Sequence, residues 1–195
     1  GRGLAAGRGR LRFTRSSEMH DVACRLAAPV DAPTLSALAI QVFLGTYAED
    51  GIGPAVAHEA HELLSPAAFD AALADPAHTF VLAEREGRLL GFAQLAFPSR
   101  HALVPHENAA ELVRLYVQER STRRGIGRAL LGQAEDEAVV RGAPTLWRSV
   151  WAPNLRALAF YDRCGYASLG ASTYRYRDDV YETRVFSKRL AAEKP

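Results

Sequence analysis

The feature that most constrains the fold is a strand that runs through a short glycine-containing loop into a helix, within residues 111–141. Residues 111–117, ELVRLYV, carry apolar, β-branched and aromatic side chains that are typical of a buried strand. Residues 125–141 repeat apolar side chains at the spacing of one helix face, at positions 126, 130, 131, 134 and 138. This order of elements predicts a mixed α/β domain.

The loop between the strand and the helix has the composition of a phosphate-binding turn. Gly125 and Gly127 stand at the start of the helix, and Arg123, Arg124 and Arg128 lie beside them. Glycines let backbone N–H groups approach a phosphate closely, and a helix N-terminus adds free donors and a partial positive charge. The segment therefore predicts a pyrophosphate site, although a glycine pair alone is equally consistent with an ordinary helix-start turn.

Two common phosphate-binding motifs are excluded by particular residues. A P-loop requires a lysine after its last glycine, and the lysines of this chain stand only at positions 188 and 194. A dinucleotide-binding motif requires Gly or Ala at position 130, which is Leu130 here. The phosphate ligand is therefore expected to belong to another class.

A second segment, NLRALAFYDRCGYASLG at residues 154–170, reads as a helix followed by a strand. Asn154 is suited to cap the helix, Gly165 to end it, and Tyr166 to begin the strand. Taken alone, Asn154 is a helix cap and Tyr161 is a packing residue whose hydroxyl finds a partner.

The two segments in this order are far more specific for one protein family than either segment is alone. A Glu-containing strand, an RRGIG helix, a strand and the pattern N-x-x-A-x-x-F-Y-x-x-x-G-Y resemble the GNAT superfamily of N-acetyltransferases. The strong match covers residues 111–170, and a looser pattern extends it to 22–190. The resemblance implies an α/β fold with a central, mostly antiparallel sheet flanked by helices on both faces. It also implies that strands 111–117 and 146–150 splay apart.

The resemblance further implies acetyl-CoA as co-substrate. Its pantetheine arm is expected to pair with the backbone of Leu115, Tyr116 and Val117 and to contact Asn154, with Tyr161 near the sulfur. Its pyrophosphate is expected on the backbone amides of the loop and the helix start, namely Arg123, Arg124, Gly125, Ile126, Gly127 and Arg128.

The chemistry of acetyl transfer to an amine asks for further groups. A free alkylamine has a pKa near 10, so a base must remove a proton before or during attack. We expect Glu111 to be that base, directly or through water, although it could equally be a surface residue or an ion-pair partner. Tyr161 can protonate the leaving thiolate. A backbone N–H at Tyr116 or Val117 can stabilise the oxyanion.

The chain departs from the family pattern at three positions. Thr122 stands where relatives usually have Gln or Arg, and Arg123 stands where they often have Gly. Because backbone donors survive both changes, we expect cofactor binding to persist in a weaker form. Ser149 stands where some relatives place a catalytic Glu. Serine cannot act as that base, which argues against the ribosomal-protein-acetylating type and favours Glu111.

The distribution of charge suggests the acceptor. No Lys or Arg occurs between Arg25 and Arg85, a stretch with acids at positions 31, 49, 50, 59, 62, 70, 75 and 84. Tyr47, Glu49 and Asp50 lie in the predicted loop after a helix at 33–44, which borders the acceptor in relatives. We therefore expect a small cationic amine such as a polyamine or aminoglycoside. The alternatives are a solvated acidic helix pair, a peptide N-terminus or lysine as acceptor, and a non-catalytic acyl-CoA sensor.

Residues 1–18 are expected to be a disordered extension, with a single domain over 19–195 beginning near Met19. The extension holds five arginines and one acid, so the overall pI of about 8.7 is no evidence for nucleic-acid binding. No apolar stretch approaches the roughly 20 residues that a membrane helix requires. With two unpaired cysteines, this predicts a cytoplasmic protein, and the preference for Arg over Lys suggests a bacterial source.

Two further expectations concern metals and assembly. The HEAHE sequence at 58–62 spaces its histidines three apart rather than four, so we expect an exposed helix face and no metal site. Further strands and helices are expected at 22–26, 55–64, 67–74, 80–86, 89–97 and 180–190. The resemblance makes a homodimer possible, and the last of these strands is a candidate to pair across its interface.

Overall fold

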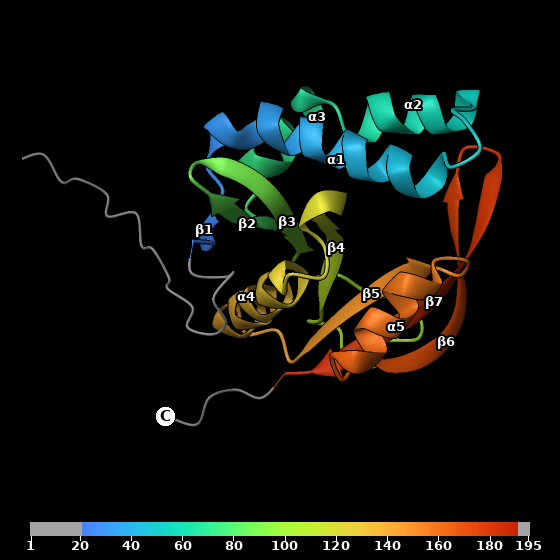
Figure 1. Ribbon diagram of the computed structural model, residues 1–195. Helices are drawn as coiled ribbons and strands as arrows, with labels where there is room; N and C mark the ends of the chain where they lie inside the picture. Colours follow the sequence, from blue (N-terminus) through green and yellow to red (C-terminus); the bar gives the residue numbers. More distant parts are fainter. Residues whose placement is uncertain (1–20, 191–195) are drawn as a thin grey trace, which may run out of the picture.

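The computed structural model describes residues 21–190, which form one seven-stranded sheet with helices on both faces (Figure 1). The segment 1–18 and the expected start at Met19 lie outside the described residues. The strands are β1 (Ala23–Leu26), β2 (His78–Arg85), β3 (Arg88–Ala96), β4 (Ala110–Val117), β5 (Thr145–Trp151), β6 (Ala167–Tyr176) and β7 (Asp179–Arg189). The α-helices are α1 (Ala32–Tyr47), α2 (Pro54–Leu63), α3 (Pro66–Ala74), α4 (Ile126–Val140) and α5 (Leu155–Arg163).

The strand order across the sheet is β1-β2-β3-β4-β5-β7-β6. All neighbours are antiparallel except β4 and β5, which are parallel. The mostly antiparallel sheet expected from the sequence is thus confirmed. Strand 180–190 has no free edge for a dimer partner, because β7 already pairs with β5 on one side and β6 on the other. A homodimer through another surface stays a prediction.

Two apolar clusters hold the helices to the sheet. One face of the sheet packs on α4 and α5, through residues such as Leu95, Leu112 and Leu130. The opposite face packs on α1, α2 and α3, through residues such as Leu35 and Phe92. Figure 1 shows the three N-terminal helices together on one side and α4 with α5 on the other. The 3.6-residue periodicity of α4 and the hairpin of β2 and β3 are where the sequence predicts them.

Helix α1 is longer than expected. The sequence predicts its end near position 44, but it continues to Tyr47. Tyr47 is therefore the last residue of a rigid helix, whereas Glu49 and Asp50 lie in the loop that follows. The extension fixes the direction of the Tyr47 ring, which packs on Phe43 at a centroid distance of 4.9 Å.

Strands β4 and β5 pair over only two positions, Ala110 with Leu146 and Glu111 with Trp147. Beyond these positions the strands separate, as expected. A bulge in the β3–β4 ladder near Gln94 leaves Val113 without a paired residue in β3. Bulges bend a strand and redirect its side chains. Beyond the bulge, Leu115 and Val117 of β4 consequently face the α4 side of the sheet.

Candidate active site

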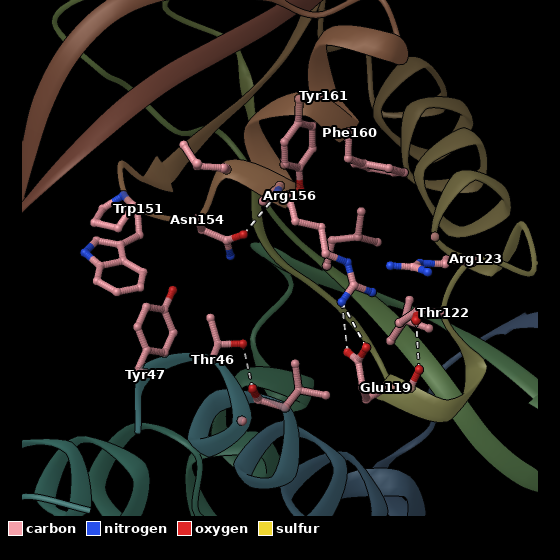
Figure 2. Close-up of a pocket in the computed structure, with 18 of the residues that line it drawn as sticks. Thr46, Tyr47, Glu119, Thr122, Arg123, Trp151, Asn154, Arg156, Phe160 and Tyr161 are labelled. Atoms are coloured by element: carbon pink, nitrogen blue, oxygen red, sulfur yellow. Dashed lines mark hydrogen bonds and ion pairs between the residues drawn. The ribbon is translucent and has the colours of Figure 1, made fainter. Parts of the chain in front are cut away.

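A cavity of about 1040 Å³ opens where β4 and β5 separate. Its walls come from the end of α1 with the following loop, the end of β4, the start of α4, and α5. Figure 2 shows side chains from these elements converging on one space. Pockets for small molecules usually enclose about 300–1,000 Å³, so this cavity can accept an extended ligand together with a second molecule.

The expected backbone pairing segment of β4 lies at this cavity, but its side chains divide between the two faces of the sheet. Leu115 and Val117 line the cavity. The Tyr116 ring instead packs edge-on against Phe92 in the core of the opposite face, at 5.6 Å between centroids. Burial raises the pKa of the Tyr116 phenol. Any ligand contact of Tyr116 on the cavity side must therefore come from its backbone.

The glycine loop meets the cavity at the N-terminus of α4. Gly125 has a left-handed backbone (φ 81°) and is the N-cap residue of the helix. A methyl group added at Gly127 would meet the ring of Phe160 at 3.6 Å, which is an ordinary contact. The protein therefore does not itself require glycine at this position. The absent side chain leaves the helix mouth open to a ligand, as a phosphate cradle requires.

The cations of this loop point in different directions. Arg123 and Arg128 line the cavity together with Thr122. Arg124 and Ile126 instead line a second, much smaller cavity. Ile126 is also part of the core. The side chains of Arg124 and Ile126 therefore point away from the large cavity, and these two residues can contact a phosphate there only through their backbone amides.

Asn154 caps α5 and also faces the cavity. Its Oδ1 accepts a hydrogen bond from the N–H of Ala157 at 3.0 Å, which confirms the capping role. The carboxamide is oriented so that its Nδ2 points into the open space in Figure 2. The amide can thus donate to a carbonyl of a ligand while its oxygen holds the helix.

Tyr161 combines deep burial with access to the cavity. Its side chain is 3% exposed and lies among Phe160, Tyr166 and Phe186. Burial raises the pKa of the Tyr161 phenol, because the phenolate would lose its hydration. The hydroxyl therefore keeps its proton at neutral pH, as a proton donor must.

Arg148 lies at the point where the backbone pairing of β4 with β5 stops. Its Nη1 donates to the carbonyl oxygens of Leu112 and Val113 at 2.8 and 2.7 Å. Its guanidinium carbon lies 6.0 Å from the centroid of the Tyr161 ring. Within residues 21–190, the buried Nε has no hydrogen-bond partner. The Arg148 side chain thus donates hydrogen bonds to β4 carbonyl groups beyond the backbone pairing with β5. It also puts a positive charge beside Tyr161.

The opposite wall carries the acidic loop. Tyr47, Glu49 and Asp50 all line the cavity. The ring of Tyr47 packs on Trp151 of β5 at a centroid distance of 5.2 Å, which connects α1 to the far side of the strand separation. Burial raises the pKa of Tyr47 to about 12. These residues form a wall that contains carboxylates but no cation of its own.

Glu111 does not lie on this cavity. It stands where β4 still pairs with β5, and its carboxylate accepts a hydrogen bond of 2.7 Å from Ser99. Cavity-lining residues of β4 begin at Leu115. The structure therefore separates Glu111 from Tyr161 and Asn154, which the sequence analysis had placed in one site with it.

Sequence reasoning missed two features of the site and one set of contacts outside it. Arg148 is a lone charge in the apolar strand LWRSV, a signal that marks a residue with an internal partner. The ion pair of Arg156 with Glu119 has no local signal. Glu59 and Glu62 of the HEAHE helix accept hydrogen bonds from tyrosines of β6, Tyr174 and Tyr176. Within the described range, no group of three His, Cys, Asp or Glu side chains is placed to hold a metal.

The sequence matches the Acetyltransferase (GNAT) family over residues 47–166, which is more than half of the chain. The chain belongs to the GNAT acetyltransferase family. It is accordingly an acetyl-CoA-dependent N-acetyltransferase. The matched range includes the glycine loop, Asn154 and Tyr161.

Three similar proteins illustrate the range of the family. Streptothricin acetyltransferase of Streptomyces lavendulae is 32% identical over 104 residues, which are 53% of this chain and 52% of that protein. The [ribosomal protein bS18]-alanine N-acetyltransferase of Escherichia coli is 42% identical over 74 residues, 38% of this chain and 47% of that one. The crystal structure of the PaiA N-acetyltransferase of Thermoplasma acidophilum in complex with coenzyme A superposes with a TM-score of 0.66 at 22% identity. The superposition covers 86% of this chain and 98% of the PaiA chain.

The acetyltransferase has no helix within residues 21–190 with the length and apolar character needed to cross a membrane.

Proposed function

We propose that this acetyltransferase moves the acetyl group of acetyl-CoA to the primary amine of a small cationic molecule by direct attack in a ternary complex. The observation that carries the proposal is a single cavity with oppositely charged walls. The loop and helix start with Arg123 and Arg128 suit the phosphates, and the wall with Glu49 and Asp50 suits an ammonium group.

The co-substrate is proposed to lie along the inner wall of this cavity. Its pantetheine arm would use the unpaired edge of β4 from Leu115 to Val117 and the Nδ2 of Asn154. Its phosphates would meet the backbone amides at the start of α4, where a helix N-terminus provides free donors. Gly127 lines the cavity without a side chain of its own, which supports this placement.

The reaction needs one bond formed, one broken and two proton movements. The neutral amine nitrogen attacks the thioester carbonyl, the C–N bond forms and the C–S bond breaks. The phenol of Tyr161 gives its proton to the departing thiolate. The attacking nitrogen becomes positively charged and passes one proton to a base, and the positive charge of Arg148 beside Tyr161 stabilises the phenolate until it regains a proton from that base through solvent.

Two routes are proposed for the proton that the amine loses, one through Glu111 and one through the acidic loop. Glu111 is separated from the cavity, so it can serve only through a water relay along the gap between β4 and β5. Glu49 and Asp50 line the cavity itself and are the nearer carboxylates for a direct or one-water transfer. Replacing Glu111 by Gln separates these routes, because an effect on kcat requires the relay.

A protein acceptor is the second candidate. The similarity to the bS18-alanine N-acetyltransferase favours it. Ser149 opposes the type with a catalytic Glu at this position, because a serine hydroxyl cannot take up the proton of an ammonium group. The two candidates differ in what they acetylate, so the acceptor must be identified directly.

The test measures release of free thiol from acetyl-CoA with a panel of polyamines, aminoglycosides, amino acids and peptides with free N-termini. The proposal expects release with cationic small amines and little with neutral amines of the same size. Release only with peptides would instead establish a protein acceptor. Binding of acetyl-CoA without release in any assay would indicate a sensor.

A further inference from the structure

A side-chain ion pair crosses the cavity. Arg156 stands on the first turn of α5, and Glu119 stands in the short 3-10 turn Glu119–Ser121 that follows β4. Nη1 of Arg156 donates to both carboxylate oxygens of Glu119, at 3.0 Å each. Both residues line the cavity, and Figure 2 shows the pair spanning the space between Asn154 and Thr122.

The backbones at both ends of this pair are fixed. Asn154 caps the first turn of α5. Hydrogen bonds to backbone carbonyl oxygens hold the turn at Glu119. The N–H of Ser121 donates to the carbonyl of Gln118, and the N–H and hydroxyl of Thr122 both donate to the carbonyl of Glu119. Side-chain rotation is therefore enough to open or close the ion pair, and neither wall has to move.

The pair itself is weak. The side chains of Arg156 and Glu119 are 55% and 79% exposed. Exposed ion pairs contribute about 0.2–1 kcal/mol, because water screens the attraction and both side chains lose freedom. A phosphate group accepts bidentate, charge-assisted hydrogen bonds from a guanidinium, and these are stronger than an exposed ion pair.

The charge of Glu119 is misplaced for the proposed cofactor position. Glu119 is the one carboxylate among the lining residues of the arginine-bearing wall, which also presents Arg123, Arg128 and Arg163. When phosphates lie on this wall, the exposed carboxylate can release Arg156 and turn away into solvent. Arg156 is then left without its partner beside the phosphates.

We propose that Arg156 is a ligand for a phosphate group of CoA, and that Glu119 holds the guanidinium in place until that phosphate replaces it. The inference rests on the cofactor orientation given under the proposed function. Glu119 thus acts as an internal competitor that lowers the affinity for CoA, and Arg156 as a cation that raises it.

The experiment compares the affinity of CoA and dephospho-CoA for the wild type, Arg156→Gln and Glu119→Gln by calorimetry. We expect Arg156→Gln to weaken CoA binding about tenfold, as for loss of a charge-assisted contact. We expect Glu119→Gln to tighten it about two- to fivefold, in line with the worth of an exposed pair. In the double variant, the gain from Glu119→Gln should disappear.

The two ligands locate the phosphate. If Arg156 meets the 3′-phosphate, Arg156→Gln weakens CoA and leaves dephospho-CoA unchanged. If it meets the pyrophosphate, both ligands lose affinity equally, and either pattern supports the proposal. Arg120→Gln is the matched control, because this exposed arginine adjoins Glu119 but does not line the cavity. It should change neither affinity.

Three results would overturn the inference. One is an unchanged affinity of Arg156→Gln for CoA, and another is weaker CoA binding by Glu119→Gln. The third is a gain from Glu119→Gln that persists when Arg156 is absent. A wild type that binds no CoA would overturn the proposed function as well, so the two failures can be told apart.

Discussion

The two walls of the cavity carry opposite charges and come from different parts of the chain. The inner wall combines the end of β4, the start of α4 and α5, and it presents Arg123, Arg128 and Arg156. The outer wall belongs to the stretch from 26 to 84, which has no Lys or Arg, and it presents Glu49 and Asp50. Two substrates of opposite charge can therefore be sorted by electrostatics before any specific contact forms.

Tyr161 lines the cavity from α5, and removal of its hydroxyl tests the chemistry without changing the charge of either wall. Tyr161→Phe keeps the buried ring and loses only the donated proton. We expect kcat to fall by about 10²–10³-fold, the usual worth of a positioned general acid. The dissociation constants of acetyl-CoA and amine should change less than about twofold, measured by steady-state kinetics and calorimetry. A loss confined to KM would contradict the assignment.

The pH profile checks the same residue. Burial raises the pKa of Tyr161 above its usual value near 10, so the acid form persists throughout the physiological range. Loss of the proton donor should therefore not lower kcat at any pH below about 10. An alkaline decline in kcat centred near pH 8 that disappears in Tyr161→Phe would show that the phenol titrates lower than its burial implies.

Arg148 connects β5 to β4 beside Tyr161, and its removal should affect folding stability most. Arg148→Met fills similar space but leaves the carbonyls of Leu112 and Val113 without their donor. We expect a loss of about 2–3 kcal/mol in the free energy of unfolding, since an unsatisfied buried polar group costs about 1–3 kcal/mol. Urea unfolding measures this value.

The control for Arg148→Met lies on the neighbouring strand. Arg184 of β7 pairs with Glu182, whose side chain is 61% exposed. Arg184→Met should change stability by less than about 0.5 kcal/mol, as exposed substitutions usually do. Equal losses in the two variants would mean that the hydrogen bonds of Arg148 to β4 contribute nothing particular.

These residues also show what sequence alone can supply. The glycine loop, the cap at Asn154 and the β2–β3 hairpin depend on neighbours within a few residues, so their patterns predict them well. Arg148 acquires its role only where β5 leaves β4, and that point is set by pairing across the sheet. Glu111 was assigned to the cleft because it shares a strand with Leu115, but the short β4–β5 pairing puts the opening further along the strand.

The positions of β7 and of the Arg156–Glu119 pair were beyond prediction for the same reason. The place of β7 between β5 and β6 depends on contacts of residues far apart in sequence. Arg156 and Glu119 are 37 positions apart and carry no motif of their own. Local signals can thus identify the elements of this site, while the sheet order decides which side chains meet.

Reversing the charge of the outer wall tests its proposed selectivity. The double variant Glu49→Lys, Asp50→Lys should raise the KM of a cationic amine at least about tenfold, because each reversal replaces an attraction by a repulsion and exposed charge pairs contribute about 0.2–1 kcal/mol each. The KM of acetyl-CoA should stay within about twofold. Asp70→Lys, on α3 and away from the cavity, is the control. An unchanged KM for the cationic amine would remove the basis for this acceptor class.

The smallest expected effect concerns Arg123, whose backbone has a positive φ of 60°. This conformation costs a residue with a side chain about 1–2 kcal/mol. Arg123→Gly removes that strain, but the more flexible unfolded chain takes back about 0.4–1 kcal/mol. We expect a net gain in stability of about 0.5 kcal/mol, together with two- to threefold weaker CoA binding from the lost cation, at roughly the worth of an exposed charge contact.

Glu86→Gly separates the two contributions. Glu86 has a similar positive φ of 51° in the turn between β2 and β3, away from the cavity. The Glu86→Gly variant should gain a stability comparable to that of Arg123→Gly, while its affinity for CoA stays that of the wild type. If Arg123→Gly binds CoA as tightly as Glu86→Gly, the Arg123 side chain adds nothing to the inner wall. The attraction for phosphate would then come from the backbone amides and the remaining arginines, and the contrast between the walls would rest on fewer charges.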